Sequence, residues 1–307
     1  MLTLNKVSAL SEDKARETLE RILWPDGPVC PHCGAMENLT RLHGKAHRTG
    51  VFQCNNCHDQ FTVTVNTIFE DSHIPLRKWL MAFALLCSAK KGISALQIQR
   101  ELELGSYRTA WHLCHRIRHA MSKEPLAGLL RGTVEVDETS VGGKPRQRHG
   151  QPKPKKGRGT KKVAVVALVE RGGRARAHKV ERVDAKTLGK AIHENIDRRS
   201  TLMTDQFGSY AEIGSKFYGG HHTVNHGKGE YVRGDASTNE VESYFALLKR
   251  GIVGSFHHVS KNHLDRYCDE FSFRWSHRKT TDSERTIRAI KGAEGRRLMY
   301  RDPVAKG

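Results

Sequence analysis

Two aspartates stand at the ends of predicted strands and could act together. Asp137 ends the segment TVEVD, and Asp205 ends TLMTD, with 67 residues between them. In an open α/β sheet, ligands gather beyond the carboxyl ends of the strands, so these side chains could meet. A single aspartate after a strand is usually a turn residue or a helix cap, so neither residue indicates a site by itself. Metal-dependent chemistry at this place would also need a third carboxylate or amide. Such hard oxygen ligands suit Mg²⁺ or Mn²⁺, and a pair of these ions can drive phosphoryl transfer.

The segment STNEVESYFALLKR, residues 237–250, can supply the third group. It reads as a helix, in which each residue turns by about 100°. Lys249 then returns to within about 20° of Glu242, Asn239 lies about 60° away, and Glu240 lies about 160° away on the opposite side. An apolar stripe adjoins this face: Val241, Phe245 and Leu248. The alternative is a solvated charged stripe, which the two upstream aspartates and the basic chain make less favoured.

Two further acids flank Asp137, and strand geometry separates them. Glu138 is adjacent and so points to the opposite side of the strand, whereas Glu135 shares the side of Asp137 one step deeper. His257 and His258 follow the predicted helix in the segment GSFHHVS. We rank these two histidines below the acids as site candidates, because a histidine in a turn is as often structural.

Four cysteines form two CxxC pairs near the N-terminus. Twenty residues separate CPHC from CNNC. This spacing is typical of a zinc ribbon, in which two knuckles complete a tetrahedral four-thiolate site. A site without an open position is structural, so we predict a structural Zn²⁺; the alternative is four free thiols. The ligands are Cys30, Cys33, Cys54 and Cys57.

A helical region follows over residues 75–121. It contains two predicted helices around a short turn, in which Ser94 is a capping residue and Gly105 ends the first helix. The second helix places Tyr107, Arg108, Arg116 and Arg118 off its apolar stripe. This is consistent with a helix-turn-helix that enters a major groove, and a helical hairpin that only packs between domains is the alternative.

The rest of the chain alternates strands and helices from Thr133 onward. Strands are predicted at 133–141, 163–170, 174–183 and 200–205, with a helix at 186–198 before the last of them. Residues 144–162 carry nine Lys or Arg and no acid, so we expect a flexible basic loop there. Strands with flanking helices indicate an α/β layer fold.

The overall charge points to a polyanionic partner. Lys plus Arg number 52 against 33 Asp plus Glu, a net charge of +19. DNA or RNA is favoured over a membrane, because no basic amphipathic helix stands out and the apolar runs fall short of the ~20 residues that span a bilayer. The N-terminus lacks the pattern of a secretory signal, which predicts a cytoplasmic protein with reduced thiols.

Together these motifs resemble the DDE transposases of bacterial insertion sequences, in particular the ISXO-like family numbered fifteen ninety-five. The resemblance rests on VEVDET, TDQFGSY, STNEVESYFALLKRGIVGSFHHVS and the CxxC pairs, and extends over residues 10–278. It implies an RNase H-like catalytic domain with Asp137 and Asp205 as metal ligands and Lys249 as a DNA contact. The family varies at its third position, so Glu242 is favoured here and Asn239 is a close second or a co-ligand.

The resemblance also implies what the protein does. We expect a zinc ribbon at 1–70, a helical region at 71–125, the catalytic domain at 133–280 and a C-terminal tail at 281–307. The enzyme would bind transposon ends as a homo-oligomer on double-stranded DNA in the nucleoid, then cut and join strands with two Mg²⁺ or Mn²⁺ ions. Two alternatives remain: an RNase H-like nuclease that does not join strands, and a non-catalytic zinc-ribbon regulator.

Overall fold

The computed structural model describes residues 1–122, 128–143, 150, 162–224, 232–233 and 236–301. These residues fall into two compact units, one of Met1–Ser122 with Lys279–Gly307 and one of Lys123–Arg278. The predicted basic loop at 144–162 lies, apart from Gly150 and Lys162, outside the described residues. The division expected at residue 70 falls inside the first unit and stays a prediction.

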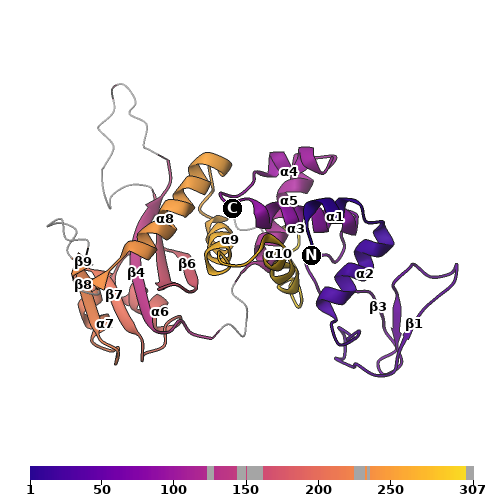
Figure 1. The fold of residues 1–307 in the computed structure, drawn as a ribbon, viewed down its shortest axis with the longest axis horizontal. Coiled ribbons are helices and arrows are strands. Elements are labelled where there is room, and N and C mark those ends of the chain that lie inside the picture. Colours follow the sequence, from indigo (N-terminus) through magenta and orange to yellow (C-terminus); the bar gives the residue numbers. More distant parts are fainter. Residues whose placement is uncertain (123–127, 144–149, 151–161, 225–231, 234–235, 302–307) are drawn as a thin grey trace. The chain divides into compact units, whose positions relative to one another are not determined.

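The first unit begins with two helices and a small antiparallel sheet (Figure 1). These elements are α1 (Leu4–Ser8), α2 (Glu12–Leu23), β1 (Leu39–Arg41), β2 (Phe52–Cys54) and β3 (Gln60–Phe61). The rings of Phe52 and Phe61 stack with centroids 5.6 Å apart, and Trp24 meets both edge-on. So small a sheet cannot bury a core of its own, and this aromatic cluster packs it onto the end of α2.

Four more helices complete the first unit: α3 (Leu76–Ser88), α4 (Ala95–Glu101), α5 (Tyr107–Ala120) and α10 (Asp282–Lys291). Ser94 caps α4 through its side chain, as predicted, and Ser106 caps α5 in the same way. Helix α10 packs against α3, α2 and α5. The segment expected to be only a tail therefore contributes a helix to the packing of the first unit.

Helix α5 is more deeply buried than its periodicity indicates. Arg116 is 6% exposed and Arg118 is 2% exposed, so the prediction that both lie outside the buried stripe is wrong. The Arg116 guanidinium donates to the carbonyl of Glu70 and lies over the Trp79 ring, which explains how a cation can be accommodated there. Exposed side chains of α5 are confined to its N-terminal turn, where Tyr107 is 53% exposed.

The second unit is built on a five-stranded mixed sheet in the order β6-β5-β4-β7-β8. The strands are β4 (Thr133–Val141), β5 (Val163–Glu170), β6 (Ala175–Val180), β7 (Thr201–Asp205) and β8 (His221–Val224). Strand β5 runs antiparallel to both neighbours, whereas β7 is parallel to β4 and to β8. The order of strands and helix along the chain is as predicted up to β7. The segment after β7 was expected to be mainly loop, but it contains α7 (Ser209–Gly214) and β8. A short hairpin follows, made of β9 (Val232–Arg233) and β10 (Ala236–Ser237).

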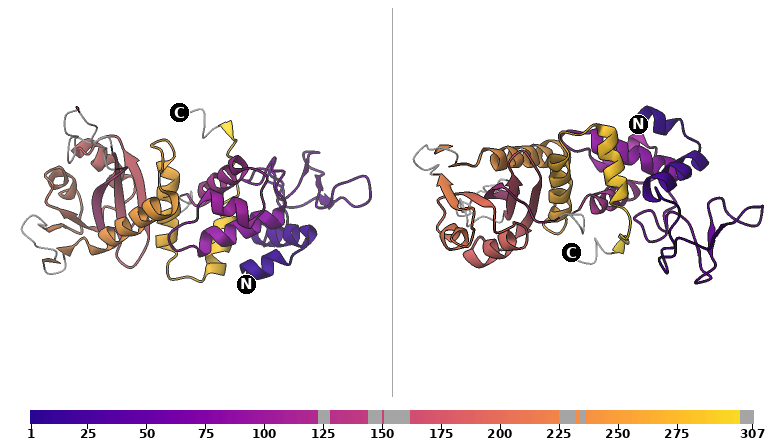
Figure 2. Two further views of the ribbon diagram at one scale, coloured as in Figure 1. Left: turned by 90° about the horizontal axis from the view of Figure 1, so that it is seen from above. Right: turned by 60° about the horizontal axis from the view of Figure 1, so that its bottom comes forward.

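Helices cover both faces of this sheet (Figures 1 and 2). Helices α8 (Asn239–Gly251) and α9 (Leu264–Ser276) pack on one face, and α6 (Ala185–His193) and α7 pack on the other. Because strand side chains alternate, Val134 and Val136 of β4 join the core under α6 and α7, whereas Val141 joins the core under α8 and α9. Odd-numbered residues of β4 therefore face α8.

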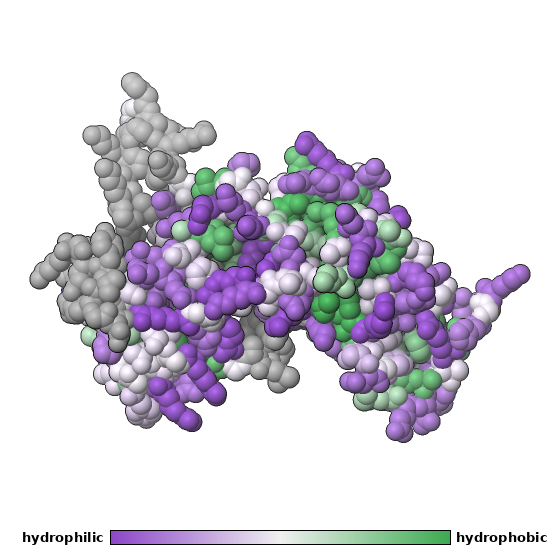
Figure 3. Space-filling model, viewed as in Figure 1, coloured by the Kyte–Doolittle hydropathy of each residue, from purple (hydrophilic) through white to green (hydrophobic). Residues whose placement is uncertain are grey.

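Hydrophilic residues cover much of the face seen in Figure 3, and apolar residues form smaller groups between them. Most exposed large apolar side chains of the described residues belong to the first unit, among them Met36, Leu96 and Tyr107. Among the described residues, no helix combines the length and the apolar character needed to cross a membrane.

Candidate active site and zinc centre

The four cysteines meet in the first unit as their spacing predicts. All four sulfur atoms lie within 4.8 Å of one another, and the Sγ atoms of Cys30 and Cys57 are 3.7 Å apart. Four sulfurs at about 2.3 Å from a tetrahedral Zn²⁺ would lie about 3.8 Å apart, so the cluster fits that ion. Each CxxC is followed by a residue in the left-handed conformation, Gly34 (φ 78°) and His58 (φ 63°), which turns the chain around the sulfurs.

The backbone favours the ligand form of one thiol. Hydrogen bonds from the backbone of Cys57, and less strongly of Asn56, outweigh desolvation and lower the pKa of Cys54 to about 7. Desolvation and hydrogen bonds with neighbouring thiols outweigh a backbone hydrogen bond and raise the pKa of Cys33 and of Cys57. A thiol must lose its proton to bind a metal, so the backbone favours the ligand form at Cys54 and not at these two thiols. The zinc centre is structural, because the four cysteines complete a tetrahedral set.

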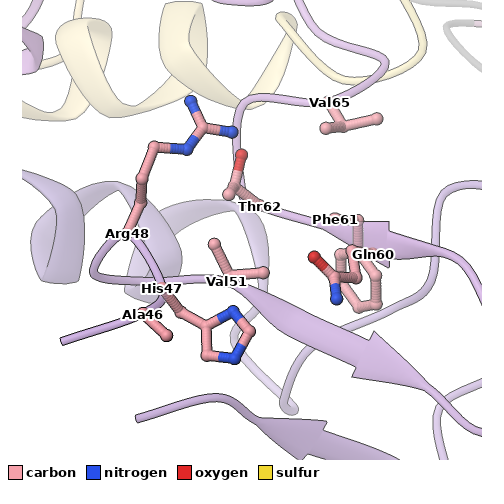
Figure 4. A pocket seen from close by; sticks show the side chains of 8 residues that line it. All are labelled: Ala46, His47, Arg48, Val51, Gln60, Phe61, Thr62 and Val65. Carbon is pink, nitrogen blue, oxygen red and sulfur yellow. The ribbon is translucent and has the colours of Figure 1, made fainter. Parts of the chain in front are cut away.

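An open hollow of about 230 Å³ lies within the zinc-ribbon region, against the small sheet (Figure 4). Its walls come from the segment between β1 and β2 and from β3: Ala46, His47, Arg48, Val51, Gln60, Phe61, Thr62 and Val65. On the β1–β2 segment, Lys45, His47 and Arg48 are exposed, and residues 38–58 contain no acid. The hollow therefore has a basic rim.

The two predicted aspartates lie on neighbouring parallel strands of the second unit. Strands β4 and β7 pair with Glu135 opposite Met203, and two residues further along each strand stand Asp137 and Asp205. Side chains at matched positions of parallel strands point to the same face. Both aspartates thus point to the face that α8 covers, although 67 residues separate them in the chain. Asp205 ends β7 as predicted, but β4 continues to Val141, so the prediction that Asp137 ends its strand is wrong and this residue lies in the middle of β4.

Negative charge is concentrated around Asp137. Burial, together with the charges of Glu138, Asp205 and Glu242, raises the pKa of its carboxyl to about 7, against one backbone hydrogen bond from Glu138 that lowers it. That amide donates to Asp137 Oδ1 at 2.7 Å, and the Phe207 amide donates to Asp205 Oδ1 at 3.0 Å. Negative charges gathered around one carboxylate favour a divalent cation, whose charge removes the repulsion.

Helix α8 carries the remaining predicted site residues. Glu242 lies close enough for its charge to act on Asp137, and its Oε1 is 3.5 Å from Thr238 Oγ1. Asn239 is the first residue of the helix and is exposed. Lys249 is also exposed, near the other end of the helix, with its Nζ 6.0 Å from the centre of the Phe245 ring. The structure thus places Glu242 within range of charge interaction with Asp137 and leaves Lys249 further along α8.

Glu240 faces away from this acidic group. Its Oε1 accepts the Gly172 amide at 2.8 Å, and its Oε2 lies 3.3 Å from Arg278. Helical periodicity thus separates Glu240 from Glu242 correctly. Among the described residues, the four thiols are the only group of three or more His, Cys, Asp or Glu side chains whose ligand atoms all lie within 4.8 Å of one another. The carboxylates of Asp137, Asp205 and Glu242 stand further apart than that.

The neighbours of Asp137 divide as strand alternation predicts. Glu138 accepts a hydrogen bond from the Tyr210 hydroxyl at 2.6 Å, and Tyr210 belongs to α7 on the opposite face. Glu135 instead contacts the start of α8. Sequence reasoning missed Tyr210 and Arg171, the partners of these two acids, because no local pattern marks either residue.

The lower-ranked histidines follow an irregular helix end. A π-helical turn, η3 (Ile252–Phe256), extends α8, and His257 follows in a left-handed conformation (φ 58°). Its Nδ1 is 3.2 Å from the carbonyl of Val253, and both His257 and His258 are exposed. π-Helical turns occur frequently at functional sites, but the carbonyl of Val253 gives His257 a structural partner.

Comparison with known proteins decides the family. The sequence model of the ISXO2-like transposase domain matches residues 129–276, and that of the transposase zinc-ribbon domain matches residues 10–60. A protein of the transposable element ISH50 from Halobacterium salinarum is 30% identical over 275 residues, which cover 86% of this chain and 91% of that protein. The chain belongs to the ISXO2-like transposase family. The resemblance inferred from the motifs is thereby confirmed. The transposase-domain model covers the strands of the mixed sheet, and the zinc-ribbon model covers the four cysteines.

Two solved structures are more distantly similar to this transposase. The Mos1 strand transfer complex is 14% identical with a TM-score of 0.30, and covers 73% of this chain and 76% of its own. A pre-cleavage Mos1 transpososome is 13% identical with a TM-score of 0.27, covering 97% and 93%. Scores this low carry no argument, and the family assignment rests on the sequence matches.

We predict that the purified transposase contains one zinc ion per chain. In Cys33→Ser or Cys57→Ser, zinc content should fall well below one, because three thiolates leave the tetrahedral set incomplete. Elemental analysis by mass spectrometry measures this directly. Cys268→Ser is the matched control, since Cys268 is a buried thiol in the second unit and its removal should leave the zinc content unchanged. Full zinc content in the Cys33 and Cys57 variants would disprove the assignment.

Proposed function

We propose that this transposase binds double-stranded DNA at the ends of its element and catalyses metal-dependent strand cleavage and strand transfer. One observation carries the proposal: Asp137 and Asp205 occupy matched positions on adjacent parallel strands, beneath the helix that carries Glu242. Family membership gives this acidic group its chemical context, because transposition requires phosphoryl transfer on DNA.

The sheet supports an RNase H-like catalytic fold. Numbered by their order within the second unit, its strands lie in the sequence third, second, first, fourth, fifth. The second strand alone is antiparallel to both of its neighbours, and helices cover both faces. We propose that this unit is the RNase H-like catalytic domain that the motifs imply.

The residues that would hold two Mg²⁺ or Mn²⁺ ions are Asp137, Asp205 and a third ligand on α8. Carboxylate oxygens are the ligands these cations prefer, and the repulsion around Asp137 fits a site that binds positive charge. When bound, such ions activate an attacking hydroxyl and stabilise the leaving 3′ oxygen. Glu242 is our first choice for the third ligand because its charge already acts on Asp137, and Asn239 is the alternative or a co-ligand.

Two displacements at phosphorus would make up the reaction. In the first, water attacks a phosphorus at the element's end, the bond to the 3′ oxygen breaks, and that oxygen takes up a proton. In the second, the freed 3′ hydroxyl attacks a phosphorus of the target DNA and displaces another 3′ oxygen. Lys249, exposed on the helix that carries Glu242, would neutralise phosphate charge near the acidic group.

The first unit offers the features suited to binding the ends. The N-terminal turn of α5 is exposed, and residues at that end of a recognition helix are the ones that contact bases. The basic rim of the hollow would contact phosphates. A homo-oligomer acting in the nucleoid completes the proposal, because joining two ends in one reaction requires that they be held together.

Replacing either aspartate should abolish catalysis while leaving DNA binding intact. In Asp137→Ala and Asp205→Ala we expect strand cleavage and joining to fall by at least about 10³-fold, since metal stabilisation of the transition state is worth several kcal/mol. Labelled donor-end duplexes with Mg²⁺ or Mn²⁺ measure both steps on a denaturing gel. Glu194→Ala, an exposed acid after α6, is the control and should retain activity.

Three outcomes of this assay would contradict parts of the proposal. An Asp137 or Asp205 variant that still joins strands would remove the active-site assignment. Cleavage without joining by the parent protein would indicate a nuclease. DNA binding with no cleavage in either metal would indicate a regulator.

The third ligand can be identified by a direct comparison. We expect Glu242→Ala to abolish strand transfer as completely as Asp137→Ala, and Asn239→Ala to reduce it less, because Glu242 is the α8 residue whose charge acts on Asp137. Glu194→Ala, the exposed acid after α6, is again the control and should retain strand transfer. Full activity of Glu242→Ala together with an inactive Asn239→Ala would exchange the two assignments.

The basic rim should contribute to DNA affinity in a salt-dependent way. Replacing Lys45 and Arg48 together by alanine should make the slope of log affinity against log salt less negative, by about one unit for each phosphate that is no longer neutralised. Fluorescence anisotropy with an end duplex at several salt concentrations measures this slope. Lys14→Ala is the control, because Lys14 is an exposed lysine paired with Glu17. An unchanged slope in the double variant would exclude the rim from the DNA interface.

A further inference from the structure

Glu135 is a buried acid on the face of β4 that α8 covers. An apolar side chain would be expected at such a position. It is 1% exposed, and it precedes Asp137 by two residues on the same side of β4. Taking a carboxylate out of water is costly unless both of its oxygens are hydrogen-bonded or paired with charge. The contacts of Glu135 must therefore account for its presence there.

Its two oxygens serve two different partners. Glu135 Oε1 accepts from the Arg171 guanidinium at 2.9 Å. Glu135 Oε2 accepts the backbone amides of Glu240 at 2.8 Å and Val241 at 3.1 Å. Those amides belong to the second and third residues of α8, which have no partner within the helix. The Glu135 side chain thus binds both Arg171, in the turn between β5 and β6, and the first turn of α8.

Helix α8 lacks the cap that a helix usually carries itself. An N-cap side chain normally accepts the amide of the second or third helical residue, but Thr238 at the N-cap of α8 makes no such hydrogen bond. Glu135 supplies it from 105 residues earlier in the chain. A negative charge at this end also interacts favourably with the helix dipole.

A second set of contacts fixes the same helix start from the β5–β6 turn. Arg171 donates to the Ser237 hydroxyl at 2.7 Å and to its carbonyl at 3.3 Å. From the same turn, the Gly172 amide donates to Glu240 Oε1 at 2.8 Å. The start of α8 is therefore fixed in both translation and rotation relative to the sheet.

This arrangement matters for the acidic group because of where the residues stand. Asp137 lies two residues beyond Glu135 on β4, and Glu242 follows Val241 on α8. A slip of α8 by one residue would turn Glu242 by about 100° and shift it by about 1.5 Å. Misplacement by about 1 Å can cost 10²-fold in rate.

We propose that Glu135 is a positioning residue, whose carboxylate ties α8 to β4 and so sets Glu242 relative to Asp137 and Asp205. The inference rests on the proposed function for its catalytic consequence, while the tie itself consists of the hydrogen bonds and the ion pair of Glu135. Glu135 is not a further metal ligand, because both of its oxygens are already engaged inside the unit.

The test compares Glu135→Gln with the parent full-length protein. Glutamine keeps the size of the side chain but removes its charge and one acceptor. Hydrogen–deuterium exchange should rise selectively in the peptide that contains the Glu240 and Val241 amides. Mn²⁺ affinity, measured by calorimetry, and the strand-transfer rate should each fall by at least about tenfold, with end-DNA affinity unchanged.

Matched variants separate positioning from stability. Glu270→Gln breaks another buried pair of this unit, Glu270 with Arg274 on α9, and should lower the melting temperature without raising exchange at the start of α8. Glu135→Asp keeps the charge on a shorter side chain and should recover part of the Mn²⁺ affinity. Should Glu135→Gln fail to fold, Ser237→Ala removes the hydrogen bond to Arg171 and should give a smaller change in the same direction.

Each result decides one point. Parent-like Mn²⁺ affinity and joining in Glu135→Gln, with only a lower melting temperature, would show a merely structural role and overturn the proposal. A parent protein that joins no strands would reject the proposed function instead. In that case amide exchange and Mn²⁺ binding would still decide whether Glu135 positions α8.

Discussion

The pairing of β4 with β7 is the constraint on which the acidic group depends. Parallel pairing in this register sets Asp137 and Asp205 two residues beyond the last paired positions of the two strands, with their side chains on one face. Because side chains alternate along a strand, a slip of one residue would turn one aspartate toward α6 and α7. The antiparallel pairing of β4 with β5 along almost its whole length holds the strand in that register from its other side.

Strand β4 also shows how packing and function are combined in one element. Its even-numbered residues Val134 and Val136 belong to the apolar core, whereas Glu135 and Asp137 between and after them are acidic. A sequence chosen for burial alone would place apolar side chains on both faces of a central strand. Violations of a local rule are expected at functional sites, and here the fully engaged oxygens of Glu135 offset its burial.

Much of this could be predicted from the sequence because the signals are local or periodic. The CxxC spacing identifies the zinc ligands, and helical periodicity separates Glu240 from Glu242. Other features depend on contacts between distant segments. Periodicity gives the direction of Arg116 on α5 but not the fact that Trp79 covers it, and no local pattern links Glu135 to an amide 105 residues away.

Strand β8 and helix α10 were not predicted from the sequence, and the reasons differ. Strand β8 has only four residues, HHTV, two of them histidines, so composition did not mark it as a strand. Helix α10, in contrast, begins with a capping box between Thr281 and Glu284 that is readable in the sequence TDSE.

The position of α10 at the end of the chain has a consequence for folding during synthesis. This helix leaves the ribosome after the whole second unit, so α3 and α2 lack one of their packing partners until translation has passed residue 291. A chain interrupted anywhere within the sheet therefore lacks Glu242 of α8 as well as the part of the first unit's core that α10 supplies.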